Sequence, residues 1–278
     1  NAVTDSHILE SDIARQRIGV ILSQNVSEMT PISADLSIRE ALPDLIAAVR
    51  RVLPMTPEQE TSLQKEMGAG RGIQDDTSLL GRLSSMVPGF VCNKFGFAGP
   101  SYSVQAACAS SLVALHSAVQ MMRTGLLDAA VVGGGEEPLS PLHFLEFSVL
   151  GALAGLTDPD RPASSMSRPF DRRRDGFVMG EGAGMIVIER ESVARRRGAH
   201  IYGYITGVGA SNTETGMVES SRYSQIRAIQ ASFAGLPYGP ESVDLVECHA
   251  TSTRQGDFEE VAALKALYPA GKRTVIAG

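Results

Sequence analysis

A cysteine at the junction of a strand-like and a helical stretch is the residue in this sequence best suited to nucleophilic chemistry. Residues 102–107 alternate polar with small or apolar side chains, as a strand does. After Cys108, apolar residues recur at the three- and four-residue spacings of one helix face: Leu112, Leu115, Val119, Met122 and Leu126. Free N–H groups and the helix dipole at a helix N-terminus favour a thiolate. Most cysteines are small core residues, so position alone leaves that alternative open.

A histidine occupies the same kind of junction 141 residues further along the chain. The apolar, strand-like run 243–248 ends at His249, which opens a loop of small residues. A cysteine with a distant histidine is the usual pairing of nucleophile and base, adjacent in space though not in sequence. The two junctions therefore predict an internal duplication in which each half supplies one catalytic group.

Three ordered motifs resemble the β-ketoacyl synthases, the condensing enzymes of fatty-acid and polyketide synthesis. The resemblance runs from about Gly19 to the end of the sequence. It rests on the nucleophile motif at 106–112, on a central signature at 168–171 and 174–184, and on a histidine loop at 249–253, which Gly256, Asp257 and Glu260 follow. The interval between Cys108 and His249 is also similar to that of the family.

The resemblance implies an α/β fold, namely the thiolase-like layered αβαβα fold with duplicated halves. Residues 1–278 would form one β-ketoacyl synthase region, with the nucleophile-bearing N-terminal half at about 1–205 and the start of the C-terminal half at about 206–278. The family's second histidine, its lysine and its Gly-Phe loop are not found in this sequence. We therefore expect the second half to be incomplete and the chain to be an internal portion of a longer synthase.

The same resemblance assigns roles to the motif residues. Cys108 would accept an acyl group from a thioester, with its backbone N–H as one donor to the oxyanion. His249 would stabilise the enolate that a malonyl-type extender forms when it loses carbon dioxide. Thr251 and Thr253 would hold the phosphopantetheine arm of an acyl carrier protein, and no tightly bound cofactor is expected. The alternative for both threonines is loop capping by their hydroxyls.

Four further residues are implied as supports of the site. Asp257 and Glu260 would brace the histidine loop, although an acidic residue in the first turn of a helix is also an ordinary capping feature. Phe177 and Glu181 would pack or hydrogen-bond below the site. The chain also departs from the family where Ala250 and Ser252 stand in place of glycine. A side chain there would be strained only if the backbone needs a positive φ, and we expect both residues to be tolerated.

Composition places limits on the partners. The chain has 278 residues, of which 43% are hydrophobic and 20% charged, and its net charge of −6 argues against bulk affinity for nucleic acid. No apolar run is long enough to span a membrane, and the odd count of three cysteines fits a reducing cytoplasm. An acyl carrier protein is acidic, so the arginine clusters at 172–174 and 195–197 are candidate contacts. The resemblance also implies a homodimer with residues 99–105 near its two-fold axis.

Metal and nucleotide sites are not predicted. The five histidines show no HxxxH or CxxC-like spacing. The glycine runs at 133–135 and 180–184 lack the fingerprint that opens a helix after a strand, so we expect them to form tight turns. Strands are predicted at 18–22, 129–132, 185–189 and 201–208, and helices at 36–52 and 192–197.

Three functions remain open at this stage. The first is an elongating β-ketoacyl synthase. The second is an acyl-transferring or decarboxylating homologue that does not elongate, since the second histidine is not found in the sequence. The third is a non-catalytic partner subunit that sets chain length, against which the presence of Cys108 argues.

Overall fold

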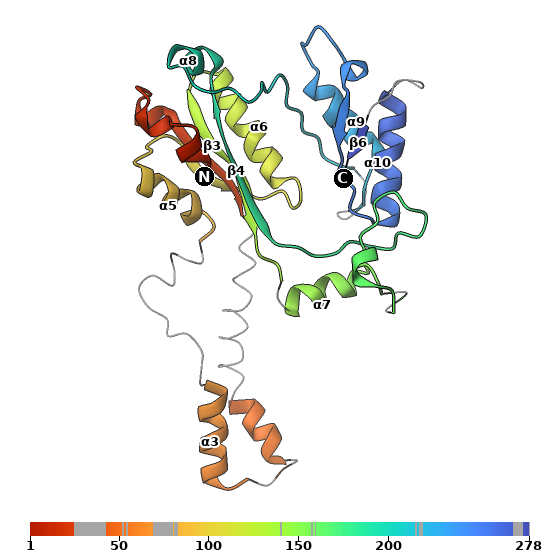
Figure 1. The fold of residues 1–278 in the computed structure, drawn as a ribbon. Coiled ribbons are helices and arrows are strands. Elements are labelled where there is room, and N and C mark those ends of the chain that lie inside the picture. Colours follow the sequence, from red (N-terminus) through yellow and green to blue (C-terminus); the bar gives the residue numbers. More distant parts are fainter. Residues whose placement is uncertain are drawn as a thin grey trace.

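Two β-sheets of unequal size organise the chain in the computed structural model. The structure describes residues 1–24, 43–51, 53, 55–68, 80, 83–139, 141–156, 158, 160–214, 216, 219–268 and 275–277. The larger sheet has the order β2-β1-β3-β4, and the smaller one pairs β5 with β6. Figure 1 shows the larger sheet on the side of the N-terminus and the smaller one beyond α6.

The larger sheet is mixed. Strand β1 (Ile18–Gln24) lies parallel to both β2 (Ser101–Val104) and β3 (Ala129–Glu136). Strand β4 (Gly182–Glu189) runs antiparallel to β3 and forms one edge, while β2 forms the other. The strands predicted at 18–22, 129–132 and 185–189 are confirmed. The prediction at 102–107 is confirmed only in its first part, because β2 ends at Val104.

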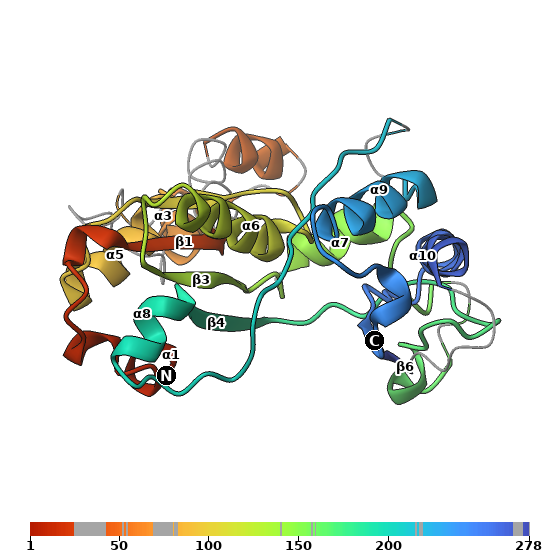
Figure 2. The same ribbon diagram turned by 90° about the horizontal axis from the view of Figure 1, so that it is seen from above.

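Helices cover both faces of this sheet because its central strand is apolar on both sides. Ile18, Val20 and Leu22 face a cluster that includes the apolar side of α5 (Met86–Phe95). Ile21 faces the opposite cluster, which includes α6 (Ser110–Arg123). Each of these side chains is almost fully buried, which stabilises the fold by about 1.5–3 kcal/mol per residue. The result is a helix–sheet–helix sandwich with α6 on its inner side, as Figure 2 shows.

The smaller sheet lies beyond α6 and carries its own helices. Strands β5 (Leu245–Glu247) and β6 (Val275–Ala277) pair in parallel. Helices α9 (Arg222–Ser232) and α10 (Arg254–Leu267) pack against each other beside them. The strand predicted to end at His249 is therefore confirmed as β5, which ends two residues earlier.

The other named helices lie outside the two sheets. They are α1 (Ala2–Asp5), α3 (Pro57–Gly68), α7 (Pro141–Val149) and α8 (Glu191–Arg196), with short 3-10 turns at Ile8–Glu10, Arg15–Arg17, Ala163–Ser165 and Pro240–Ser242. Helix α3 stands well apart from both sheets (Figure 1). The helix predicted at 192–197 is confirmed as α8. The helix predicted at 36–52 lies partly outside the described residues, and its described part is helical over 43–51. None of the helices that the structure describes is both long and apolar enough to cross a membrane.

The prediction of turns at the two glycine runs is wrong. Strand β3 continues through Gly133, Gly134 and Gly135, and β4 already begins at Gly182. A Cβ at Gly133 would lie 2.1 Å from the carbonyl oxygen of Gly184 on the neighbouring strand. Gly133 therefore allows close approach of two strands, whereas a Cβ at Gly182 or Gly184 would meet nothing within 4 Å.

The strand predicted at 201–208 is not formed. The apolar alternation of this segment is real, but none of the described residues pairs with it in a ladder, and a strand needs such a partner. The segment instead crosses α9 at close range. A Cβ at Gly207 would lie 1.7 Å from the carbonyl oxygen of Ser232, so the crossing requires glycine.

Candidate active site

Cys108 lies in the short connection between β2 and α6. It is exposed, and α6 begins two residues later at Ser110, so the expected position near a helix N-terminus is confirmed. The Ser110 hydroxyl closes the turn, since it accepts from the Ala106 N–H at 2.7 Å and donates to the Ala107 carbonyl at 2.6 Å. Ala107 itself is left-handed, with φ 48°. Sequence reasoning missed this role of Ser110.

A small cavity opens beside the thiol. Its volume is about 310 Å³, and it lies between the nucleophile turn and the ends of three strands. The lining residues are Ser23, Ala107, Cys108, Ser111, Gly134, Gly135, Glu136, Gly182, Ala183 and Gly184. Most of them are glycine, alanine or serine, which leaves room next to the sulfur for the atoms of an acyl group.

The structure brings Cys108 and His249 together. The two side chains form a hydrogen bond, which lowers the pKa of the Cys108 thiol and raises the pKa of the His249 imidazole. Burial and the nearby Glu136 carboxylate act in the opposite direction on the thiol, but the hydrogen bond is the largest influence. The pair is thus poised towards a thiolate beside an imidazolium, the activated form of a cysteine nucleophile.

The neighbouring cysteine has the opposite character. Cys248 precedes the histidine in sequence, yet burial raises its pKa to about 11, helped by the Glu260, Glu247 and Asp257 carboxylates. Its thiol is therefore protonated under ordinary conditions and is a poor nucleophile. Of these two cysteines, only Cys108 has the environment of a reactive one.

Glu260 holds the start of the histidine loop. Its two carboxylate oxygens accept from the backbone N–H groups of His249, at 2.7 Å, and Ala250, at 2.9 Å. Glu260 lies almost two turns into α10, so it ties the loop to the helix that follows it. This contact is of the bracing kind expected for Glu260.

Thr251 and Thr253 present their hydroxyls to each other. The two Oγ1 atoms lie 3.0 Å apart. Thr253 is the N-cap residue of α10, but its side chain makes no capping hydrogen bond. A Cβ at Gly256 would lie 2.4 Å from the Thr253 hydroxyl, so the glycine makes room for it. Capping of α10 therefore does not account for the position of this hydroxyl.

Asp257 joins the histidine loop to the central signature. The carboxylate is 1% exposed, accepts from the N–H groups of Phe170 at 2.7 Å and Ser252 at 3.0 Å, and forms an ion pair with Arg174 at 3.4 Å. Asp257 was expected to brace the loop, but its partners 83 to 87 residues earlier in the chain could not be read from the sequence. Arg174 also donates to the carbonyl of Thr253 at 3.0 Å.

The two residues at the usual glycine positions both have left-handed backbones. Ala250 has φ 44° and Ser252 has φ 67°. Because both φ angles are positive, a side chain at either position strains the backbone. A left-handed residue with a side chain costs about 1–2 kcal/mol. Both residues are buried among the contacts that hold the loop, and these contacts offset the strain. That the substitutions are tolerated in catalysis stays a prediction.

Phe177 and Glu181 lie on the segment that leads into β4. Phe177 packs edge-on against Phe147 of α7, with ring centroids 5.2 Å apart, and its backbone N–H donates to Ala152 at 2.9 Å. Glu181 is exposed directly before β4 begins.

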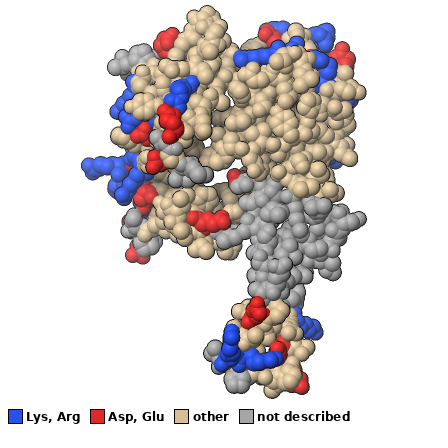
Figure 3. Space-filling view, turned by 180° about the vertical axis from the view of Figure 1, so that it is seen from behind, with Lys and Arg blue, Asp and Glu red and all other residues tan. Residues whose placement is uncertain are grey.

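The arginines of the two clusters differ in whether they form buried ion pairs within the protein or are exposed. Arg197 forms a largely buried ion pair with Glu189 at 2.7 Å, and Arg174 is held at the histidine loop. Arg172 and Arg173 are exposed, the latter side chain by 75%. Seen from behind, charged side chains of both signs lie mainly towards the margins of the molecule (Figure 3).

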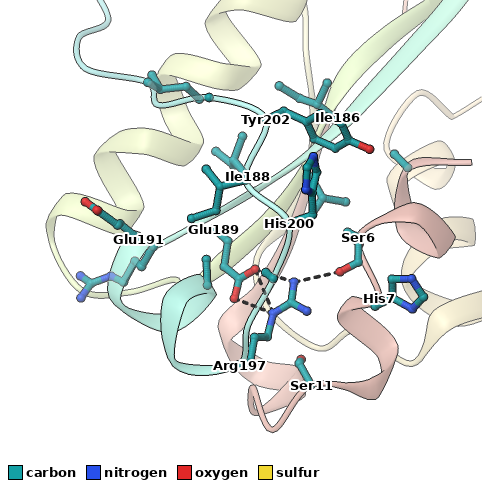
Figure 4. A pocket seen from close by; sticks show the side chains of 18 of the residues that line it. Ser6, His7, Ser11, Ile186, Ile188, Glu189, Glu191, Arg197, His200 and Tyr202 are labelled. Carbon is teal, nitrogen blue, oxygen red and sulfur yellow. Dashed lines mark hydrogen bonds and ion pairs between the residues drawn. The ribbon is translucent and has the colours of Figure 1, made fainter.

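A larger cavity of about 1410 Å³ lies away from Cys108 and His249. It runs along the free edge of β4, and Figure 4 shows Ile186, Ile188 and the Glu189–Arg197 ion pair on one side. Tyr202 stacks edge-on against His200 there, with ring centroids 4.4 Å apart. Within the described part of the chain, no group of three or more His, Cys, Asp or Glu side chains could hold a metal ion.

Two protein-family models match the chain, one over the part that contains the larger sheet and one over the part that contains the smaller sheet. Residues 1–194 match the model of the β-ketoacyl synthase N-terminal domain, and residues 202–277 match that of the C-terminal domain. The chain belongs to the β-ketoacyl synthase family, and its layered α/β architecture is the thiolase-like one.

Individual relatives come from polyketide and fatty-acid synthesis. The chain is 38% identical over 198 residues to the spectinabilin polyketide synthase system protein NorA' of Streptomyces orinoci, covering 69% of this chain and 5% of that protein. It is 36% identical over 188 residues to the mitochondrial 3-oxoacyl-[acyl-carrier-protein] synthase of Arabidopsis thaliana, covering 67% and 40%. The chain thus spans well under two thirds of the length of these relatives.

Solved structures of ketosynthases are similar over most of the chain. One is a type II polyketide synthase complex, AntDE:AntF, described as an acyl-carrier protein with its ketosynthase bound to the hexaketide. It superposes with a TM-score of 0.74 and 25% identity, covering 99% of this chain and 62% of that one. The ketosynthase from module 6 of the bacillaene synthase of Bacillus subtilis 168 gives a TM-score of 0.64 and 25% identity, covering 90% and 36%.

Proposed function

We propose that this chain carries the acyl-binding centre of an elongating β-ketoacyl synthase, with Cys108 as nucleophile and His249 as its partner. The observation that carries the proposal is the hydrogen bond between the two side chains, which lowers the pKa of the thiol. The family membership and the cavity of small residues beside the sulfur support it. The environment of Cys108 gives no support to a non-catalytic partner subunit.

The first step is acyl transfer. The Cys108 thiolate attacks the carbonyl carbon of an acyl thioester on a carrier protein, and an S–C bond forms as the carbonyl oxygen becomes an oxyanion. The oxyanion collapses, and the bond from carbon to the pantetheine sulfur breaks. The departing thiolate takes the proton that His249 had received from Cys108.

The second step is condensation. A malonyl-type extender loses carbon dioxide, and the electron pair of the broken C–C bond remains as an enolate. His249 donates a hydrogen bond to the enolate oxygen and so stabilises it. The enolate carbon attacks the acyl carbon on Cys108, the S–C bond breaks, and the thiolate is regenerated as the β-ketoacyl product leaves.

The carrier protein is the proposed partner, and its phosphopantetheine arm is the proposed ligand of the threonine pair. Thr251 and Thr253 lie between His249 and α10 with their hydroxyls 3.0 Å apart, and Thr253 does not use its hydroxyl to cap the helix. The related AntDE:AntF complex, which contains an acyl-carrier protein and its ketosynthase, supports this partner.

The proposed assembly is a homodimer formed through β2. This strand is an edge of the larger sheet and carries residues 101–104, within the segment expected near the two-fold axis. An edge strand offers backbone groups to a second copy. Light scattering on the full chain should give twice the monomer mass.

Mass spectrometry of the full chain with acyl-carrier substrates tests the proposed chemistry. We expect an acyl adduct on Cys108. When malonyl-loaded carrier protein is added, the adduct should be lost and a β-ketoacyl product should form. Cys108→Ala should abolish the adduct, whereas the matched variant Cys248→Ala should retain it. A wild-type protein without an adduct would sink the covalent mechanism, and an adduct without product would favour the acyl-transferring alternative.

A further inference from the structure

Ser252, in the middle of the histidine loop, is a fully buried polar residue in an unusual backbone conformation. It is 0% exposed and left-handed, with φ 67°. Serine rarely adopts this conformation, so the surroundings must hold it there. The contacts that hold Ser252 in this conformation therefore also fix the loop that carries His249.

All three polar groups of Ser252 are hydrogen-bonded, and two of them reach a distant segment. Its N–H donates to Asp257 at 3.0 Å, on α10. Its carbonyl accepts from the Gly176 N–H at 3.1 Å, and its hydroxyl oxygen accepts from the Arg168 N–H at 3.0 Å. Both last donors belong to the central signature, 76 and 84 residues earlier. The residue thus fixes the loop against two elements at once.

The hydroxyl is the one contact here that depends on serine. Backbone groups make the other two, and the neighbouring ties between Asp257, Phe170 and Arg174 do not involve the Ser252 side chain. Glycine at this position would relieve the left-handed strain but would leave the Arg168 N–H without this acceptor. The contribution of the hydroxyl can therefore be separated from that of the backbone.

We propose that Ser252 is a positioning residue whose hydroxyl, by accepting from the Arg168 N–H, holds the His249 imidazole at the Cys108 thiol. Glu260 fixes the first two residues of the loop, and Ser252 fixes its middle against the central signature. These contacts restrain the loop both from α10 and from the central signature. The inference rests on the proposed function only in treating this pair as the catalytic one.

The test is the pH profile of Cys108 alkylation by iodoacetamide in the full chain, followed by peptide mass spectrometry. Ser252→Ala removes the hydroxyl and keeps the strain, and Ser252→Gly removes both. We expect both profiles to move to higher pH by roughly one unit, which is about tenfold slower alkylation at a fixed pH below the transition.

A matched control should leave the profile unchanged. Ser232→Ala removes a half-buried hydroxyl on α9, away from the histidine loop. Circular dichroism confirms that each variant is folded.

Two outcomes overturn the proposal. They are a wild-type profile for folded Ser252→Gly and a wild-type profile for folded Ser252→Ala. Failure of the proposed function is distinguishable, because it appears as alkylation of Cys108 without any acyl adduct from carrier substrates. If Ser252→Ala does not fold, Ser252→Gly decides, because glycine relieves the left-handed strain.

Discussion

His249 has the largest influence on the pKa of the Cys108 thiol. The hydrogen bond with His249 lowers the thiol pKa, whereas burial and Glu136 raise it. We predict that His249→Ala moves the onset of Cys108 alkylation to higher pH, beyond that of an ordinary cysteine, because the raising influences remain. Alkylation at neutral pH should slow by about tenfold for each unit by which the pKa rises. Stopped alkylation time courses across the pH range measure this.

Cys248 is the internal control for that experiment. With a pKa of about 11 it should stay unmodified at neutral pH in both proteins. If His249→Ala left the Cys108 profile where it was, the imidazole would not be the activating group.

At the residue scale, Cys108 and His249 could be predicted from the sequence, but the contacts that hold the histidine loop could not. Cys108 and His249 each follow a strand at a small-residue turn, a pattern that local spacing reveals. Ser252 and Asp257 act through partners more than 75 residues away, Arg168 and Phe170. Such contacts depend on the tertiary fold, and no local pattern encodes them.

At the scale of elements, the pairing of β3 with β4 depends on glycine. Gly133 lies opposite Met185, and a Cβ there would lie 2.1 Å from the Gly184 carbonyl oxygen. We predict that Gly133→Ala lowers the free energy of unfolding by more than about 2 kcal/mol, because the strands must separate. Thermal and denaturant unfolding of the full chain measure the change.

Gly182 on β4 provides the comparison. A Cβ at Gly182 meets nothing within 4 Å, so Gly182→Ala should unfold close to the wild type. Equal destabilisation by the two variants would mean that strand propensity, and not the close approach, sets the cost.

Elements were predictable where their packing is local. The apolar runs of β1 and β3 are buried in the sheet. The three- and four-residue spacing after Cys108 predicted α6 only in part, because the helix ends at Arg123, before Leu126, and leaves Leu112 exposed. The segment 201–208 also has a strand-like pattern of apolar residues, but it has no ladder partner among the described residues. The strand predicted there from the pattern alone is therefore wrong. The glycine runs failed for a related reason, because a missing side chain serves a turn and a close strand contact equally well.

For the whole molecule, recognition of an acidic carrier requires local positive charge on a chain with net charge −6. Arg172 and Arg173 are exposed beside Arg174, which contacts the histidine loop. We predict that reversing both exposed arginines to glutamate raises KM for carrier-linked substrate about tenfold. KM for the same acyl group on free pantetheine should not change, because that substrate lacks the acidic surface. Steady-state kinetics with both substrates measure the difference.

Reversing Arg195 and Arg196 on α8, in the other candidate cluster, is the charge-matched comparison. These two exposed arginines lie across the molecule from the histidine loop, so their reversal should leave both KM values unchanged. An equal effect on carrier and pantetheine substrates would mean that the reversed charges disturb the site itself.

The distance along the chain between Cys108 and His249 has a consequence for synthesis on the ribosome. The thiol is made 141 residues before its partner, which corresponds to about 7–30 s at ordinary rates of translation. Until α10 and its preceding loop have been made and docked, the cysteine lacks the group that activates it. Under the proposed mechanism, the nascent chain therefore carries a thiol that is not yet activated, and electrophiles in the cell meet the activated pair only after both halves have folded.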